Sequence, residues 1–335
     1  MEERRSISVQ ITDALGENDV LPNDFAIEAE EIEGFKFAPG AMDGITIYHM
    51  GYSELDDAEK EKLGEILSLV AWECDEIFDL EDAIDEFCKV HRAITIMDDI
   101  TQYVISHQDK LNAGNVRMNA ERLTLESVSI ECVKVGLILL ELFKPDDFVE
   151  VIANTLGRYD EFTIFSIFLL GRFKDGSNKI LELAKSVKGW GRIHCISMMN
   201  AESDEIKDWI LKNGVDNCIM PAYSGLDTFN KADVRGILKR DRITREELTA
   251  ILKIIGAMLD EGPVDGISAL EDAFDVLVQV LEKAAALLPL DISDYQIIKQ
   301  IDEWQKENAE GDNPELERLM NEMFYEERAR KQIKV

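Results

Sequence analysis

The sequence predicts an all-α fold, arranged as an irregular solenoid of helical hairpins with a small N-terminal β-hairpin. The 335 residues include only 7 prolines and 20 glycines, and the long stretches between them are rich in Leu, Ile, Glu and Ala, which favour helix. A two-helix pattern occurs twice between Leu156 and Gly214. Repetition of this kind, with a period of 20 to 50 residues, is typical of stacked helical hairpins.

The N-terminal segment, residues 1–52, differs from the rest of the chain in its pattern of apolar and polar residues. Its sequence GFKFAPGAMDGITIYHM alternates apolar and polar residues on both sides of Pro-Gly and Asp-Gly turn signals. This pattern predicts two short strands, roughly 34–37 and 45–49. Because a strand pair alone is only marginally stable, the hairpin is expected to pack on helices.

Three helical regions follow: an acidic region at 53–143, the helical repeats at 144–262 and a C-terminal region at 263–335. Apolar spacing together with Gly and Pro breaks predicts the helices within them. They are expected near 55–71, 74–88, 90–108, 119–143, 146–156, 161–172, 177–187, 190–199, 203–212, 231–239, 245–260, 266–287, 293–308 and 313–332.

The repeat is clearest in its second helix. An offset of 26 residues pairs Ser177 with Ser203 as helix caps and Leu183 with Trp209 as buried positions. Trp209 is therefore predicted to be buried between stacked hairpins. The same offset matches Ile180 with Ile206 and Ala184 with Ile210. Gly189 and Gly214 stand at the two positions where a left-handed helix end is expected.

The stretch GWGRIHCISMM followed by ESDEIKDWIL resembles bacterial HEAT-like helical-repeat proteins, some of which carry the label limonene hydroxylase. The resemblance covers roughly residues 150 to 220 and implies a HEAT-like α-solenoid. A hydroxylase needs iron, haem or flavin, but the sequence has no Glu-x-x-His pair, no glycine-rich flavin loop and no haem-thiolate context. The residues themselves therefore predict no cofactor.

The charge excludes two classes of partner. The net charge is −32, and a polyanion of this size is repelled by nucleic acid and by anionic membranes. No apolar stretch is long enough to cross a bilayer, and the N-terminus lacks the apolar core of a secretory signal. Five cysteines are too few and too apolar in context for a disulfide framework. A cytoplasmic protein is expected.

The acidic stretch ECDEIFDLEDAIDE at 73–86 carries eight carboxylates. An EF-hand would need a central glycine, which is missing. Apolar residues instead recur at three- and four-residue spacing, which predicts one solvated amphipathic helix rather than a calcium site. These residues are Ile77, Leu80, Ile84 and Phe87.

No catalytic or metal-binding residue is predicted. Cys88, His91 and Asp98 could share a helix face as metal ligands, but ordinary packing is the favoured interpretation, since no second Cys or His pair stands nearby. Adjacent His194 and Cys195 point in different directions on a helix and cannot act as base and nucleophile. The segment GWGRIH at 189–194 lacks the third glycine of a dinucleotide fingerprint and predicts close helix packing around Trp190.

The function expected from these features is that of a non-enzymatic protein-interaction scaffold. A basic cluster in this acidic chain is the candidate partner-binding site, although a solvated turn remains open. Two alternatives also remain open: an enzyme with an unrecognised active site, and a binder of a small anion in a basic groove. The cluster consists of Arg235, Lys239, Arg240, Arg242 and Arg245.

Overall fold

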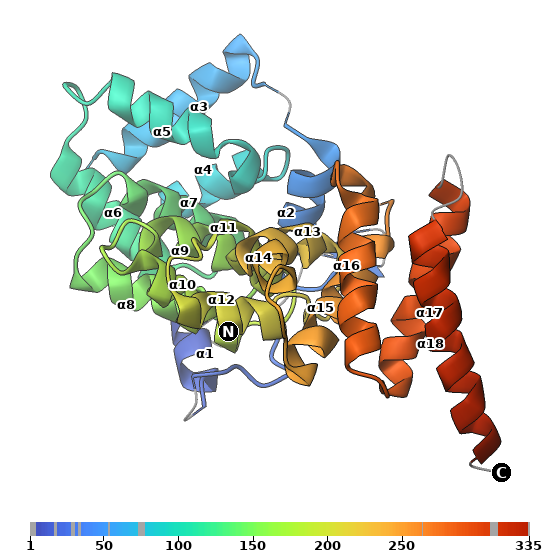
Figure 1. Cartoon of the computed structure of the whole chain (residues 1–335). Coiled ribbons are helices and arrows are strands. Elements are labelled where there is room, and N and C mark those ends of the chain that lie inside the picture. The colour runs from blue at the N-terminus through green and yellow to red at the C-terminus, as the bar shows by residue number, and fades with distance from the viewer. Residues whose placement is uncertain are drawn as a thin grey trace. The chain divides into compact units, whose positions relative to one another are not determined.

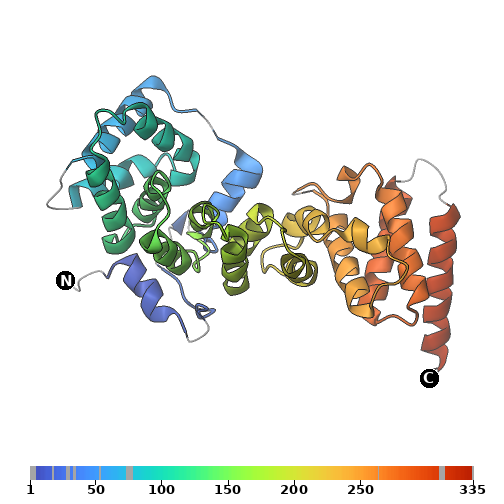
Figure 2. The same cartoon turned by 60° about the vertical axis from the view of Figure 1, so that its left-hand side comes forward.

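The computed structural model describes residues 5–16, 19–27, 31–32, 35–52, 54–72, 78–262, 264–308 and 314–333. Eighteen α-helices lie in this part of the chain, and the fold there is mostly helical (Figure 1). The chain divides into two compact units, Met1–Met199 and Asn200–Val335, whereas the sequence predicted four regions. Figure 2 shows the same helices from a second direction.

The first unit begins with one helix and two short strands, followed by two consecutive helical segments, and the remaining helices follow in chain order. Its elements are α1 (Ile7–Ala14), β1 (Glu31–Ile32), β2 (Phe35–Lys36), α2 (Ala41–Ile45), the π-helix η1 (Thr46–Met50), α3 (Asp57–Val70), α4 (Phe78–Cys88), the 3-10 helix η2 (Ala93–Thr95), α5 (Met97–Ser106), α6 (Ala113–Glu126), α7 (Ile130–Glu141), α8 (Asp147–Leu156), α9 (Thr163–Leu170), α10 (Gly176–Ser186) and α11 (Trp190–Met198).

The second unit is built from seven further α-helices in its described residues. They are α12 (Asp204–Asn213), α13 (Ala222–Lys231), α14 (Val234–Leu238), α15 (Arg245–Leu259), the 3-10 helix η3 (Ile267–Ala269), α16 (Ala273–Ala286), α17 (Ile292–Asn308) and α18 (Pro314–Ile333).

Helix α7 forms the centre of the first unit. Apart from Lys134, its residues from Cys132 to Leu140 are apolar or glycine, as expected of a helix that is surrounded by others, and every one of them is buried. It packs against α4, α5, α6 and α9. Ser129 fixes its start, because the side chain accepts a hydrogen bond from the backbone N–H of Cys132.

Helix α15 has the same role in the second unit. It packs against α12, α13, α16 and α17, and its buried face runs from Leu248 to Met258. A capping box at Thr244 and Glu247 satisfies backbone donors at its first turn. This Thr-x-x-Glu signal agrees with the helix predicted at 245–260.

The predicted N-terminal hairpin is wrong at its second strand. Residues 45–49 are helical, in α2 and η1, and the short ladder pairs β1 with β2 instead. The physical reason is a tertiary contact: Trp190 lies so close to Gly44 that an added Cβ would be 2.2 Å from the indole ring. Gly40, with a φ of 74°, turns the chain into α2. Packing on Trp190 therefore outweighs the alternating pattern.

Other boundaries were also predicted incorrectly. The single helix expected at 119–143 is two helices, α6 and α7, because residues 127–129 are not helical, and Ser127 and Ser129 have extended backbone angles. There the hydroxyl of Ser127 accepts a hydrogen bond from the N–H of Ser129 at 3.0 Å. Helices α1 and α13 were not predicted at all. Conversely, the amphipathic face of the acidic helix is confirmed at Leu80, Ile84 and Phe87, which are buried; Ile77 lies outside the described residues.

Several details of the predicted repeat need correction. Ser203 caps α12 through the N–H of Ile206, but Ser177 lies inside α10. Gly189 and Gly214 both have negative φ angles, so neither is a left-handed helix end. Trp209 is half-buried rather than buried. The division between the two units falls between α11 and α12, inside the second copy, and the solenoid stays a prediction.

None of the helices in the described residues has both the length and the apolarity needed to cross a bilayer.

Candidate functional site

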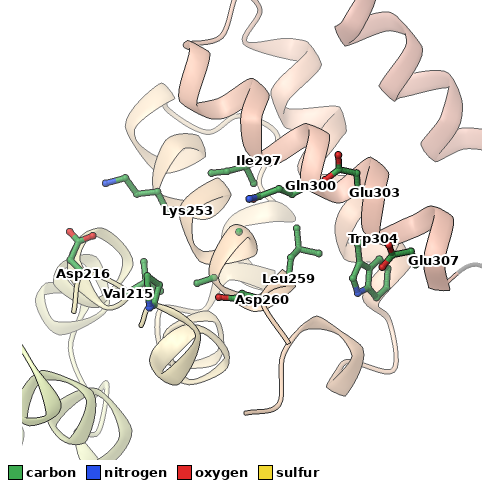
Figure 3. Close-up of a pocket in the computed structure, with 13 residues that line it drawn as sticks. Val215, Asp216, Lys253, Leu259, Asp260, Ile297, Gln300, Glu303, Trp304 and Glu307 are labelled. Carbon is green, nitrogen blue, oxygen red and sulfur yellow. The ribbon is translucent and has the colours of Figure 1, made fainter. Parts of the chain in front are cut away.

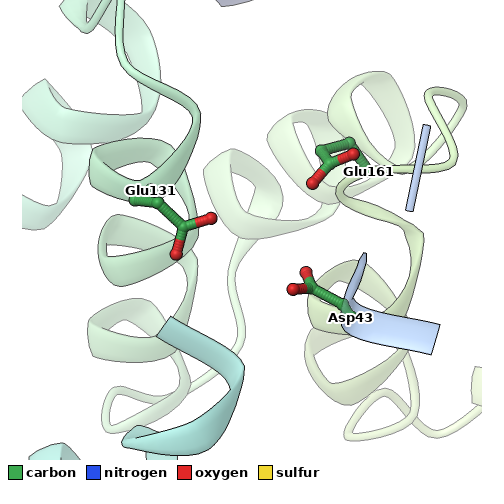
Figure 4. Close-up of side chains that lie close together, drawn as sticks. All are labelled: Asp43, Glu131 and Glu161. Carbon is green, nitrogen blue, oxygen red and sulfur yellow. The ribbon is translucent and has the colours of Figure 1, made fainter. Parts of the chain in front are cut away.

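A cluster of buried charges in the first unit is centred on Lys134 of α7. Its side chain is completely buried, with 0% exposure. The ammonium Nζ lies 2.6 Å from Oε1 of Glu161, 2.7 Å from Oδ2 of Asp43 and 2.9 Å from Oε1 of Glu131. Figure 4 shows the three carboxylates converging from separate segments. Glu131 stands one helical turn before Lys134, so the same face of α7 supplies both.

Arg92 adds a second cation to this cluster. Its Nε donates to Oδ1 of Asp43 at 2.8 Å, and its Nη2 donates to Oε1 of Glu131 at 3.3 Å. Backbone donors complete the set: the N–H of Ala93 reaches Oε2 of Glu131, and the N–H of Gly40 reaches Oε2 of Glu161. The three carboxylates and two cations are therefore satisfied largely by one another, and we call them the Lys134 network.

The electrostatics of the Lys134 network favour the charged forms of Lys134 and Asp43. Burial alone would lower the pKa of Lys134, but attraction by Asp43, Glu131 and Glu161 outweighs burial and raises it. For Asp43, burial raises the pKa, but Lys134 and Arg92 outweigh that effect and the net pKa is lowered. Charges buried this deeply are tolerated because they are paired.

A metal ion is not needed to explain the three carboxylates. One oxygen from each of Asp43, Glu131 and Glu161 lies within 4.8 Å of the others, a spacing that could hold a cation. The Lys134 ammonium already contacts all three, so it takes the place that such an ion would occupy. The geometry is that of a clamp that joins α2, α7, the segment before η2 and the segment before α9.

The metal-ligand candidates from the sequence do not converge. The Nε2 of His91, which follows α4, lies 2.9 Å from Oε1 of Glu59 in α3, and the His91 ring packs on Phe87. Cys88 is buried, and burial raises the pKa of its thiol. Asp98 is exposed to solvent. The favoured interpretation of ordinary packing agrees with these positions.

The GWGRIH segment forms the start of α11. The carboxylate of Asp160 accepts a hydrogen bond from the N–H of Gly189 at 3.1 Å, and burial raises the pKa of Asp160 to about 6. A carboxylate thus occupies the position where a dinucleotide would place its phosphates. Cys195 is buried with a raised thiol pKa, which makes it a poor nucleophile.

The five predicted partner-binding residues extend from Arg235 in α14 to Arg245, the first residue of α15, in the second unit. Three have contacts within the chain: Arg235 pairs with Asp272, Arg240 pairs with Glu247, and Arg245 donates to the carbonyl of Leu287. Lys239 and Arg242 are exposed, and neither forms an ion pair with any residue that the structure describes. Only part of the cluster is therefore available to a partner.

The second unit also contains a groove that the sequence did not predict. Its volume is about 700 Å³, and it lies along α15 and α17 (Figure 3). Ile297 and Gln300 of α17 face α15, and Gly256 lets the helices approach, since an added Cβ would lie 3.3 Å from Ile297. The apolar lining is Val215, Pro221, Ala257, Leu259, Ile297 and Trp304; the charged lining is Asp216, Asp260, Glu303, Glu307 and Lys253.

One signal in the sequence could have revealed the Lys134 network. Lys134 is the only cation in the apolar run VKVGLILL, and a buried lysine requires partners. Its partners Asp43 and Glu161 come from distant parts of the chain, so local spacing could not identify them. The α15–α17 groove depends on the packing of two helices and has no local signal.

Comparisons with known proteins add no relative: no family model, no curated protein and no solved structure matches this chain.

Proposed function

We propose that this protein is a non-enzymatic interaction scaffold whose second unit binds a basic, amphipathic helical segment of a partner protein. The observation that supports this proposal is the composition of the α15–α17 groove. Its lining combines an apolar surface with four carboxylates and one ammonium. A helix that docks in a groove uses its apolar face for affinity, and flanking Lys and Arg side chains would be attracted to the carboxylates.

The positions of other groups weigh against the alternative functions. Cys88, Cys132 and Cys195 are buried with raised thiol pKa values, and the charges of the Lys134 network are mutually paired. An anion-binding groove would need the basic cluster to be free, but Arg235 and Arg240 are paired with carboxylates of the chain itself. Lys239 and Arg242 remain a proposed second contact, for an acidic part of a partner.

A titration with designed peptides tests the groove. The probe is an amphipathic helix of about 18 residues built from Leu and Lys, with two controls: the same peptide with Glu in place of Lys, and a scrambled Leu/Lys sequence. Anisotropy of the labelled peptide is measured against the full chain at low and high salt. The Lys peptide is expected to bind about tenfold more tightly than either control, with a marked loss at high salt.

Matched variants locate the binding. The double variant Glu303→Gln and Glu307→Gln removes two exposed carboxylates of the groove. It is expected to weaken the binding of the Lys peptide several-fold. Glu271→Gln changes the charge of an exposed residue outside the groove and should leave binding unchanged. Equal binding of the Lys and Glu peptides, or equal effects of the two sets of variants, would contradict the proposal.

A further inference from the structure

A separate cavity in the first unit has the features of a ligand site. Its volume is about 650 Å³, within the range of small-molecule pockets. It is lined by parts of η1, α3, η2, α5, α9 and α11, together with Tyr52 and Glu54. The lining residues are Ile47, Tyr48, Tyr52, Glu54, Lys60, Ile94, Thr95, Met97, Asp98, Asp99, Ile164, Phe168, His194, Ser197 and Met198.

His194 supplies an unmet hydrogen-bonding group in the wall of this cavity. The residue is 3% exposed, and its Nε2 has no hydrogen-bond partner among the described residues. Buried polar atoms are nearly always hydrogen-bonded, so an unpartnered imidazole nitrogen in a residue that lines a cavity marks this part of the fold as unusual. Burial also lowers the pKa of His194 to about 4, which keeps the imidazole neutral at physiological pH.

Aromatic rings surround His194 on one side. The ring of Tyr48 stacks on the imidazole at a centroid distance of 6.3 Å, and Trp190 lies 6.2 Å from it. Tyr48 belongs to η1, and short π-helical turns occur frequently at functional sites. Tyr52, which is more than half exposed, lies at the rim. Faces of aromatic rings attract cations.

The charge of the cavity favours a cation as well. Glu54, Asp98 and Asp99 contribute three carboxylates, against the single ammonium of Lys60. Asp98 lies near enough to Tyr52 to act on it: burial, then Asp43 and Asp98, raise the pKa of that phenol. Carboxylate and aromatic ring therefore stand together at the rim, the combination that organic cations prefer.

We infer that this cavity binds a small protonated amine with an apolar or aromatic body. The body would pack against the apolar and aromatic lining, and the ammonium would lie near the rim carboxylates. The inference concerns the first unit alone and does not depend on the proposed function of the second.

Three probes of one shape and different charge test the ligand class. Phenethylamine is a cation at neutral pH, phenethyl alcohol is its neutral analogue and phenylacetate is an anion. Each is titrated into the full chain by calorimetry and by ligand-observed NMR. The amine is expected to bind about tenfold more tightly than the alcohol, with no binding of the anion. Equal binding of amine and alcohol, or no binding of the amine up to about 10 mM, overturns the inference.

Variants test the location. Asp98→Asn removes an exposed rim carboxylate. It should weaken the binding of the amine several-fold and leave the binding of the alcohol unchanged. Asp109→Asn makes the same charge change at an exposed residue outside the cavity and should have no effect. Tyr52→Ala, at another exposed position, should also weaken the amine. His194→Gln is tested after circular dichroism has established its fold. If Asp98→Asn and Asp109→Asn behave alike, the amine binds elsewhere and the inference fails.

Discussion

Lys134 and His194 are both buried ionisable residues of the first unit, but burial leaves Lys134 charged and His194 neutral. Lys134 keeps its charge, because three carboxylates within 2.9 Å replace the water that it has lost. His194 has no such carboxylate at hydrogen-bond distance in the described structure, and burial disfavours its charged form, which lowers its pKa to about 4. The difference depends on the neighbours of each side chain and not on its depth.

The lowered pKa of His194 predicts a specific pH dependence of stability. In the unfolded chain histidine takes up a proton near pH 6.5, whereas in the folded chain His194 does so near pH 4. Between these values the unfolded state binds more protons, so His194 makes the folded state less stable as the pH falls from 6.5 to 4. The full effect is about 3 kcal/mol. Urea unfolding of wild type and His194→Gln across this range measures it.

The informative quantity is the difference in the free energy of unfolding between the wild type and His194→Gln. Asp160 has a folded pKa of about 6, above its ordinary value, so its contribution to stability rises as the pH falls from about 6 toward 3.8. This opposing effect is present in both proteins and cancels in the difference. The wild type should lose stability relative to His194→Gln on acidification. Parallel pH profiles of the two proteins would show that His194 does not titrate in this way.

At the scale of elements, the turn between α14 and α15 carries two exposed cations, Lys239 and Arg242, that form no ion pair with the described residues, whereas Arg240 in the same turn is paired with Glu247. Lys239→Glu with Arg242→Glu should leave the free energy of unfolding within about 0.5 kcal/mol, because both side chains are exposed. Binding of a Glu-rich probe peptide should weaken and lose its dependence on salt. Circular dichroism, urea unfolding and titration at two salt concentrations provide the three measurements.

Arg235→Glu is the matched comparison. Its guanidinium pairs with Asp272 at 2.6 Å and lies 4.9 Å from the ring centroid of Phe229. The reversed charge of Arg235→Glu stands beside Asp272, and both the ion pair and the contact with the Phe229 ring are lost. Because the ion pair is partly exposed to solvent, the free energy of unfolding should fall by only roughly 1 kcal/mol. If the double variant keeps full affinity and salt response for the acidic probe, Lys239 and Arg242 belong to a solvated turn only.

At the scale of the whole molecule, each unit has its own buried centre, α7 in one and α15 in the other. We therefore expect the units to lose structure separately. Lys134→Met leaves three carboxylates without their central cation and should destabilise the first unit by about 3–5 kcal/mol. Ile255→Ala creates a cavity in the second unit and should cost about 2–5 kcal/mol.

Hydrogen exchange resolved by segment distinguishes the units. In Lys134→Met, faster exchange is expected in α6, α7 and α9, with α15 and α16 unchanged; Ile255→Ala should give the reverse pattern. Lys185→Met, which removes a partly exposed lysine with an exposed partner, serves as the control and should alter neither. Faster exchange throughout the chain in either variant would mean that the two units unfold as one.

The sequence by itself determined what depends on local order. The helical class, the amphipathic face at Leu80, Ile84 and Phe87, and the start of α15 at its Thr-x-x-Glu box follow from spacing between near neighbours. Each of these features is set by residues a few positions apart, where helical periodicity and capping act.

Only the tertiary structure decided the rest. Residues 45–49 alternate like a strand, yet they are helical where Trp190 packs on Gly44. The Lys134 network joins residues more than a hundred positions apart, and the cavity beside His194 and the groove between α15 and α17 have walls from several helices. The burial of a side chain, its ion pairs and the volume of a pocket all depend on which segments of the chain pack together. Short-range sequence patterns do not contain that information, because the contacts are made between distant parts of the chain.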